Sequence, residues 1–201
     1  MAQAHIHPIF DRLLQTETKE KQLNQRGKVI WLIGLSGSGK STIAQHLEVK
    51  LYDEGFLTQV LDGDNIRSGL NKNLTFSDED RLENIRRISE VAKLFANCGI
   101  VTLASFITPT EAIRQMAKEI IGEDKYIEVF VSTSLEECEK RDVKGLYSKA
   151  RKGIIKNFTG IDSVFETPQN PAIVLSTEGQ TIEETVETLY QFIIKKISYK
   201  H

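Results

Sequence analysis

One short segment contains residues whose types and spacing could bind phosphate. Residues 34–41 read GLSGSGKS, which fits the pattern G-x-x-x-x-G-K-[ST], between an apolar run at 29–34 and a helical pattern starting near residue 40. Glycines let the backbone bend until successive N–H groups face one point, and the N-terminus of the next helix adds its positive dipole end. The pattern predicts a polyphosphate-binding loop, and a ligand-free turn is the less favoured alternative.

The end of this loop has the residue types that phosphoryl transfer uses. We expect Lys40 to neutralise the β- and γ-phosphates of ATP and the Ser41 hydroxyl to bind Mg²⁺. Switches, motors and small-molecule kinases share the motif, but the N-K-x-D base-reading motif of guanine-specific switches is missing from the sequence. A kinase is therefore favoured. The predicted nucleotide-binding residues are Gly34, Leu35, Ser36, Gly37, Ser38, Gly39, Lys40, Ser41 and Thr42.

A pair of carboxylates follows the second predicted strand. In the segment LDGDNIRSGL, Asp62 and Asp64 stand where the chain leaves the sheet, beside the predicted phosphate loop. One could hold Mg²⁺ or accept the proton of an attacking hydroxyl, and the other could bind a substrate group. The alternative is an Asx turn in which either residue caps the next helix. We predict Asp62 as the proton acceptor or metal-orienting residue.

Composition sets limits on the partners. The chain has 26 Lys and Arg against 28 Asp and Glu, so its net charge of -2 does not predict a nucleic-acid or membrane binder. The two cysteines, Cys98 and Cys138, are too few for a disulfide framework. The first residues do not read as a signal peptide, and no apolar run reaches membrane-spanning length. We expect a cytoplasmic protein.

The order of the predicted elements indicates an α/β fold. Apolar runs at 29–34, 57–61, 100–105, 126–131 and 172–176 alternate with helical patterns, which predicts a parallel five-stranded sheet flanked by helices. Residues 1–26 read as an N-terminal arm and 27–201 as one domain. Residues 142–171 break the alternation, and this basic, glycine-punctuated stretch predicts a mobile lid. In the helix at 78–97, the predicted buried residues are Leu82, Ile85, Ile88, Val91, Ala92 and Phe95.

The chain strongly resembles adenylylsulfate kinases, from about residue 27 to residue 171. The matching stretches are GLSGSGKST, LDGDNIRSGL, FSDEDRLENIRR (76–87), SFITP (105–109), RDVKGLY (141–147) and KNFTGIDSVFE (156–166). The resemblance implies a P-loop kinase fold that uses ATP and Mg²⁺. It also implies phosphorylation of the ribose 3′-hydroxyl of adenosine 5′-phosphosulfate (APS) to 3′-phosphoadenosine 5′-phosphosulfate (PAPS), the activated sulfate donor, by a homodimer.

The resemblance also assigns substrate-contacting residues. The SFITP segment has Thr108 where these kinases usually carry a serine. That serine has been described as a phosphorylated intermediate. We expect this threonine to contact the substrate and not to carry phosphate, because its extra methyl would crowd an in-line attack. The implied substrate contacts are Asp64, Asn65, Ile66, Arg67, Phe76, Arg81, Asn84, Ile107, Thr108, Lys144 and Phe158. With Lys40 and Asp62 from the motifs above, Thr108 completes the candidate catalytic residues.

The chemistry of these residue types agrees with an anionic, aromatic substrate. Guanidinium groups such as those of Arg67 and Arg81 bind phosphosulfate, and phenylalanine rings stack on adenine. Simpler roles are also open: Phe76 and Phe158 could be core aromatics, and Arg81 could pair with Glu83 or Glu90 on the helix surface. Two other functions are open: a kinase acting on a sugar acid or nucleoside, and a non-catalytic nucleotide-binding module.

Overall fold

A parallel five-stranded sheet forms the centre of the protein. The computed structural model describes residues 5–199, and its strands lie in the order β2-β3-β1-β4-β5. Each neighbouring pair is parallel, for example β1 with β3 and β4 with β5. The predicted fold class is therefore confirmed. The strands are β1 (Val29–Ile33), β2 (Thr58–Asp62), β3 (Val101–Ser105), β4 (Tyr126–Ser132) and β5 (Ile173–Ser176).

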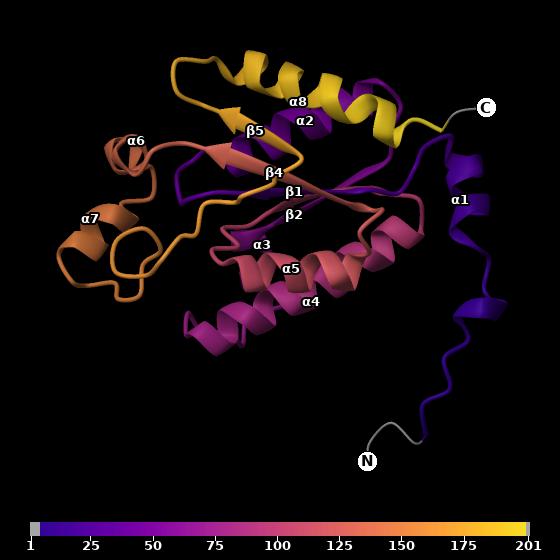
Figure 1. Cartoon of the computed structure of the whole chain (residues 1–201), viewed down its shortest axis with the longest axis horizontal. Coiled ribbons are helices and arrows are strands. Elements are labelled where there is room, and N and C mark those ends of the chain that lie inside the picture. The colour runs from indigo at the N-terminus through magenta and orange to yellow at the C-terminus, as the bar shows by residue number, and fades with distance from the viewer. Residues whose placement is uncertain (1–4, 200–201) are drawn as a thin grey trace.

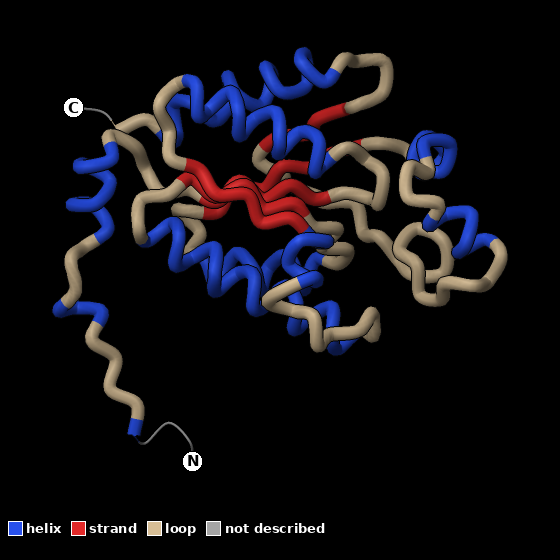
Figure 2. The backbone as a smooth tube through the Cα atoms, turned by 180° about the vertical axis from the view of Figure 1, so that it is seen from behind, coloured by secondary structure: helices blue, strands red, loops and turns tan. Residues whose placement is uncertain are grey.

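Helices cover both faces of this sheet. Figure 1 shows α2 and α8 on one side and α4 and α5 on the other, and Figure 2 gives the same three layers from behind. Each layer has its own core, because successive strand residues face opposite sides. The longer helices are α2 (Lys40–Asp53), α4 (Asp78–Asn97), α5 (Glu111–Ile121) and α8 (Ile182–Ile197).

The apolar pattern of α4 explains its packing with one exception. Ile85, Ile88 and Ala92 are buried against the sheet, as the three- and four-residue spacing predicts. Val91 and Phe95 are partly buried and pack on the same cluster. The prediction for Leu82 is wrong, because its side chain is 44% exposed. Leu82 is the fifth residue of α4, near its N-terminal end.

The ends of the helices follow the capping residues in part. Thr181 and Glu184 form a reciprocal capping box at the start of α8. At α4 only half of such a box is present: the Ser77 hydroxyl accepts from the Asp80 N–H, whereas the Asp80 carboxylate binds Thr75. Gly122, at φ +101, ends α5.

Short helices lie at the two ends of the sheet. At the carboxyl ends of the strands, α6 lies just before the region predicted as a lid and α7 lies within it. At the opposite end lies the predicted N-terminal arm, which contains α1 (Figure 1). Gln25, next to α1, is 1% exposed and bonds Leu57 and Gly99, so this part of the arm packs on the domain. No helix within residues 5–199 is long and apolar enough to cross a membrane. The short helices are η2 (Phe10–Arg12), α1 (Thr16–Leu23), α3 (Gly63–Ser68), α6 (Leu135–Arg141) and α7 (Leu146–Arg151).

Candidate active site

The glycine-rich loop between β1 and α2 has the backbone of a phosphate cradle. Gly39 precedes α2 at φ +103, a conformation that residues with a side chain rarely adopt. At Gly34, a Cβ atom would lie 2.6 Å from the carbonyl oxygen of Val131 on β4. No side chain caps the N-terminus of α2, so its first N–H groups remain available to a ligand. The loop therefore has the free donors that an anion requires.

Lys40 lies inside this loop. Its Nζ donates to the carbonyl of Leu35 at 2.7 Å and to the Ser38 hydroxyl at 3.4 Å. The residue is 8% exposed, and burial lowers the pKa of its ammonium from 10.5 to about 8. A polyphosphate would supply the negative charge that this buried ammonium lacks in the free protein.

The predicted metal-binding residues meet at the carboxyl edge of the sheet. The Ser41 Oγ donates to the Asp62 Oδ2 at 2.6 Å and lies 3.3 Å from the Ser105 Oγ. Hydroxyl and carboxylate oxygens fit Mg²⁺, which usually takes one or two protein carboxylates and completes its shell with water and substrate phosphates. Within residues 5–199 there is no cluster of three His, Cys, Asp or Glu side chains, so a metal site of the zinc type is not present there.

Asp62 also caps the next helix, which was the structural alternative to a role in catalysis. Its Oδ1 accepts from the Asp64 N–H at 3.0 Å, and Asp62 is the N-cap of α3. The two roles use different oxygens, because Oδ2 faces Ser41. The cap therefore orients the carboxylate towards the phosphate loop.

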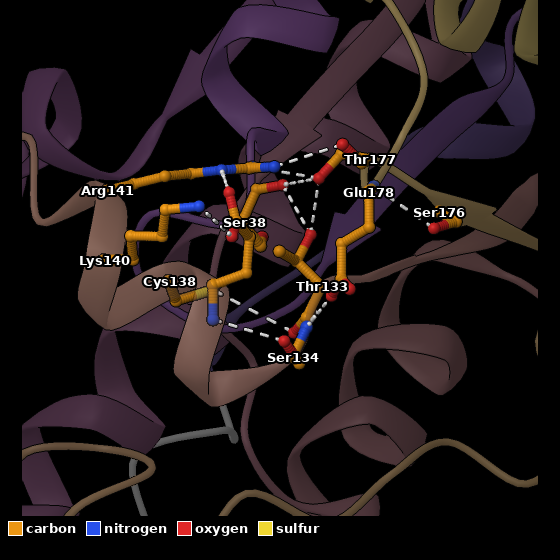
Figure 3. A network of polar contacts seen from close by, with 10 residues as sticks. Ser38, Thr133, Ser134, Cys138, Lys140, Arg141, Ser176, Thr177 and Glu178 are labelled. Atoms are coloured by element: carbon orange, nitrogen blue, oxygen red, sulfur yellow. Dashed lines mark hydrogen bonds and ion pairs between the residues drawn. The ribbon is translucent and has the colours of Figure 1, made fainter.

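A polar network that the sequence reasoning missed connects the phosphate loop to β4 and β5 (Figure 3). The hydroxyls of Thr133 and Thr177 donate to the Ser38 carbonyl at 3.0 and 3.3 Å. The Arg141 guanidinium donates to the Thr177 hydroxyl and carbonyl at 2.9 and 3.1 Å. Both threonines directly follow strand ends, and Arg141 begins the quoted RDVKGLY stretch. The place of the threonines after apolar strands, and of Arg141 in a family-like stretch, could have identified these three residues from the sequence.

The predicted substrate contacts after β2 and at the start of α4 are called the acceptor side here. Two of them stack on each other. The Arg67 guanidinium lies 4.3 Å from the centroid of the Phe76 ring, and Phe76 is 64% exposed. Arg67 also donates to the Thr75 carbonyl at 2.9 Å. Phe76 is therefore not a core aromatic, and its exposed ring can meet a flat ligand.

The predicted lid, residues 142–171, contacts predicted substrate-binding residues at two places. Lys144 forms an ion pair with Asp64, which follows β2. Arg81 on α4 donates to the Thr159 hydroxyl at 2.9 Å and to the Asn157 carbonyl. The alternative role for Arg81, a helix-surface pair with Glu83 or Glu90, is wrong, because its guanidinium reaches these two residues instead. Glu83 pairs with Arg86 and Arg87, and Glu90 with Arg86. Predicted substrate contacts thus hold the lid and the body together.

The remaining aromatic contact lies within the lid. Phe158 packs edge-on against Tyr147, with ring centroids 4.9 Å apart, in a small cluster that includes Leu35. The Tyr147 hydroxyl donates to the Ser36 carbonyl at 2.8 Å. The lid therefore also packs on the phosphate loop, through a contact that the sequence did not predict.

Two predicted contacts face the interior. Asn84 is 5% exposed, and its Oδ1 accepts from the buried Asn71 side chain at 2.9 Å. Thr108 is 1% exposed and has φ +46, and its Oγ1 accepts from the Trp31 indole N–H at 2.9 Å. Arg81 and Asn84 share α4 as expected, but Asn84 is directed into the protein. Asn65 is exposed, and Ile66 and Ile107 are half-buried, near the ends of β2 and β3.

This geometry defines the protein as a P-loop kinase: a phosphate loop after β1 and a carboxylate at the end of β2, with the predicted lid, residues 142–171, at the same sheet edge. The family model for adenylylsulphate kinase matches residues 26–176. A curated adenylyl-sulfate kinase from Bacteroides thetaiotaomicron is 59% identical over 196 residues, which are 98% of either chain. The chain belongs to the adenylylsulfate kinase family.

Solved structures agree with this assignment. The chain is similar to the APS kinase of Mycobacterium tuberculosis in complex with AMPPNP and APS, with a TM-score of 0.81 and 46% identity over 84% of this chain and 98% of that one. It is also similar to a hexameric APS kinase from Thiobacillus denitrificans, with a TM-score of 0.66 and 27% identity, over 89% of this chain and 30% of that one.

Proposed function

We infer that this protein is an adenylyl-sulfate kinase that transfers the γ-phosphoryl group of ATP to the 3′-hydroxyl of APS, giving PAPS and ADP in sulfate assimilation. The observation that carries this proposal is the 2.6 Å hydrogen bond between Ser41 and Asp62. It joins the nucleotide loop to the strand end beside which the acceptor residues lie. Membership of the adenylylsulfate kinase family selects APS as the acceptor.

The proposed reaction is a direct transfer between the two nucleotides. The bond between the γ-phosphorus and the β–γ bridging oxygen breaks, and a bond to the 3′-oxygen of APS forms. Lys40 and the loop N–H groups stabilise the charge that develops on the phosphoryl oxygens. Asp62 accepts the 3′-hydroxyl proton or orients the reacting groups. Each of its carboxylate oxygens keeps a free lone pair beside its present hydrogen bond.

The buried position of Thr108 supports transfer without a phosphothreonine. Its hydroxyl accepts a hydrogen bond from the indole of Trp31, in the core of the α4–α5 layer. An in-line attack would require this oxygen to leave the indole and face the γ-phosphorus. We therefore propose that Thr108 shapes the acceptor pocket through its backbone and does not carry phosphate.

For the acceptor, we propose that the basic side chains bind the phosphosulfate and the rings bind adenine. Arg81, on the body, contacts Thr159 of the lid, and Lys144, on the lid, contacts Asp64 of the body. Both would exchange these partners for the anion. Phe76 offers an exposed ring and Phe158 a half-buried one. The remaining proposed contacts are Asp64, Asn65, Ile66, Arg67, Asn84, Ile107 and Thr108.

Mg²⁺ is the metal that the donor set fits. We propose that Ser41 and Asp62 hold it together with the phosphates of ATP, where it would neutralise phosphate charge. Residues 34–42 would hold the triphosphate. Arg141 and Thr177 extend this nucleotide side beyond the phosphate loop.

We further propose a cytoplasmic homo-oligomer with no nucleic-acid or membrane partner. The free thiols of Cys98 and Cys138 agree with a reducing compartment. The hexameric relative agrees with assembly of several chains, and a homodimer is our specific proposal. Light scattering of the purified protein would test that state.

Comparison of acceptors tests the proposed function. Turnover should be high with APS and at background with gluconate or nucleosides, because these lack the phosphosulfate that the basic residues bind. Comparable turnover with a sugar acid would establish the alternative kinase instead. Absence of ADP release with any acceptor would favour a non-catalytic nucleotide-binding module.

A further inference from the structure

Glu166 makes two hydrogen bonds that attach the end of the lid to the body. Its backbone N–H donates to the Pro109 carbonyl at 2.8 Å, and its Oε2 accepts from the Glu111 N–H at 2.6 Å. Glu111 is the first residue of α5, so the carboxylate caps this helix and meets its positive dipole end. The helix's own N-cap, Thr110, makes a longer bond, at 3.4 Å. Glu166 therefore supplies the shorter cap from a distant segment.

The capped segment is the one that leads from β3 to α5 through Thr108. The Arg114 guanidinium, 1% exposed, donates to the Thr108 carbonyl at 3.2 Å and pairs with the Glu111 carboxylate at 2.9 Å. Glu166 then closes a ring of contacts around residues 108–111. Thr108 holds its φ of +46 inside this ring, a conformation that a β-branched residue adopts only when its surroundings impose it.

The residue before Glu166 fixes the same segment to the sheet. The Phe165 ring stacks on Phe130 of β4 with 6.1 Å between the ring centroids. Residues 165–166 are therefore attached to the body on both sides, although they lie within the stretch predicted as a lid. Upstream, the lid residues Asn157 and Thr159 contact Arg81, an acceptor-side residue. Glu166 thus lies where the lid joins the body.

We propose that Glu166 is a positioning residue for the acceptor: its carboxylate fixes residues 107–111, and so the part of the acceptor pocket beneath the lid. This inference rests on the proposed function, because it takes Ile107 and Thr108 as part of the APS site. Without the carboxylate, the Glu111 N–H loses its partner and the ring around Thr108 opens. The nucleotide loop, held by Thr133 and Thr177, keeps its contacts.

Steady-state kinetics of Glu166→Ala and Glu166→Gln in the full chain test the proposal. Glu166→Ala should raise the KM for APS by roughly tenfold, the size of effect expected for loss of a helix cap, and change the KM for ATP less than about twofold. Glu166→Gln keeps an oxygen acceptor and should restore most of the APS affinity. Thr181→Ala removes a cap of the same kind from α8 and serves as the control for stability alone.

Three results would overturn the proposal. The first is an unchanged APS KM in Glu166→Ala. The second is an equal rise in both KM values. The third is that Thr181→Ala, with a similar loss of melting temperature, raises the APS KM as much. Absence of APS-dependent ADP release in the wild-type protein would instead contradict the proposed function, which separates its failure from that of the role of Glu166.

Discussion

The Ser41 hydroxyl donates a 2.6 Å hydrogen bond to the Asp62 carboxylate, although these residues lie on different elements, α2 and the end of β2. The contact arises because parallel strands end at one edge of the sheet, where the loop after β1 meets the strand end of β2. It joins the nucleotide loop to the strand end beside which the predicted acceptor residues lie.

Replacing Asp62 with Asn should lower kcat by about 10²-fold or more, because an amide neither accepts a proton nor carries the charge that a metal requires. The amide oxygen can still accept from the Asp64 N–H, so the cap of α3 should survive. The variant should also need more Mg²⁺ for half-maximal turnover. Ser41→Thr is the matched control, because it keeps the hydroxyl, and it should retain activity. A kcat of Asp62→Asn within threefold of wild type would remove Asp62 from the chemistry.

The lowered pKa of Lys40 predicts how ATP binding depends on pH. Burial brings this pKa to about 8 in the free protein, so the ammonium that meets the phosphates is lost as pH rises through 8. The kcat/KM for ATP, which reports the free enzyme, should therefore fall above about pH 8. ATP binding by Lys40→Arg should stay flat over this range, since a guanidinium remains protonated. A flat profile for the wild type would contradict the assignment.

The same pKa predicts an opposite trend for stability. The folded pKa of about 8 lies below the value of 10.5 expected in the unfolded chain, so the unfolded state binds more protons between these values. The free energy of unfolding contributed by this group should rise with pH over that window. Urea unfolding of wild type and Lys40→Met at several pH values measures this contribution. Plots of unfolding free energy against pH that run parallel for the two proteins would contradict the prediction.

Arg81→Ala should raise the KM for APS at least tenfold, because it removes a charge-assisted contact, and leave the KM for ATP nearly unchanged. Arg81 donates to Phe76, Asn157 and Thr159, all on the acceptor side or in the lid. Arg81→Lys keeps the charge but lacks the guanidinium fork, so partial recovery is expected. A loss of ATP affinity instead would mean that the two sites are exchanged.

Thr108→Ala should retain a measurable fraction of kcat and lose stability. The substitution leaves the buried Trp31 N–H without its partner, which costs about 1–3 kcal/mol. Thr108→Ser keeps the hydroxyl and should stay close to wild type in stability. Mass spectrometry after incubation with ATP alone should find no phosphothreonine. Stoichiometric phosphate on Thr108, released by APS, would restore a two-step mechanism.

The sequence predicted the sheet and the phosphate loop because both depend on local patterns. The apolar runs and the glycine spacing each identify one segment without reference to any other. The lid was harder to predict. Residues 142–171 lack a clear period, and only the structure shows that Phe165 and Glu166 are attached to the body while α7 packs near the phosphate loop.

The site residues that the sequence did not predict, or whose side chains point elsewhere than expected, depend on contacts between segments far apart in the chain. Arg141 finds its partner Thr177 across 36 positions of sequence, and Asn84 is buried because Asn71 supplies its hydrogen bond. Leu82 fits the apolar period of α4 but is exposed near the first turn of the helix and is not part of the core cluster on that face. A periodicity specifies a face of a helix and not how far the neighbouring layer extends along it.

The most direct test of the central claim is the transfer itself. ADP release should be measured with ATP, Mg²⁺ and APS, and the nucleotide product identified by mass spectrometry and phosphorus NMR. We predict one ADP for each PAPS formed, with the new phosphate on the 3′-oxygen and turnover abolished in a folded Lys40→Ala variant. ADP release independent of APS, phosphate on another atom, or near-normal turnover in Lys40→Ala would contradict the account.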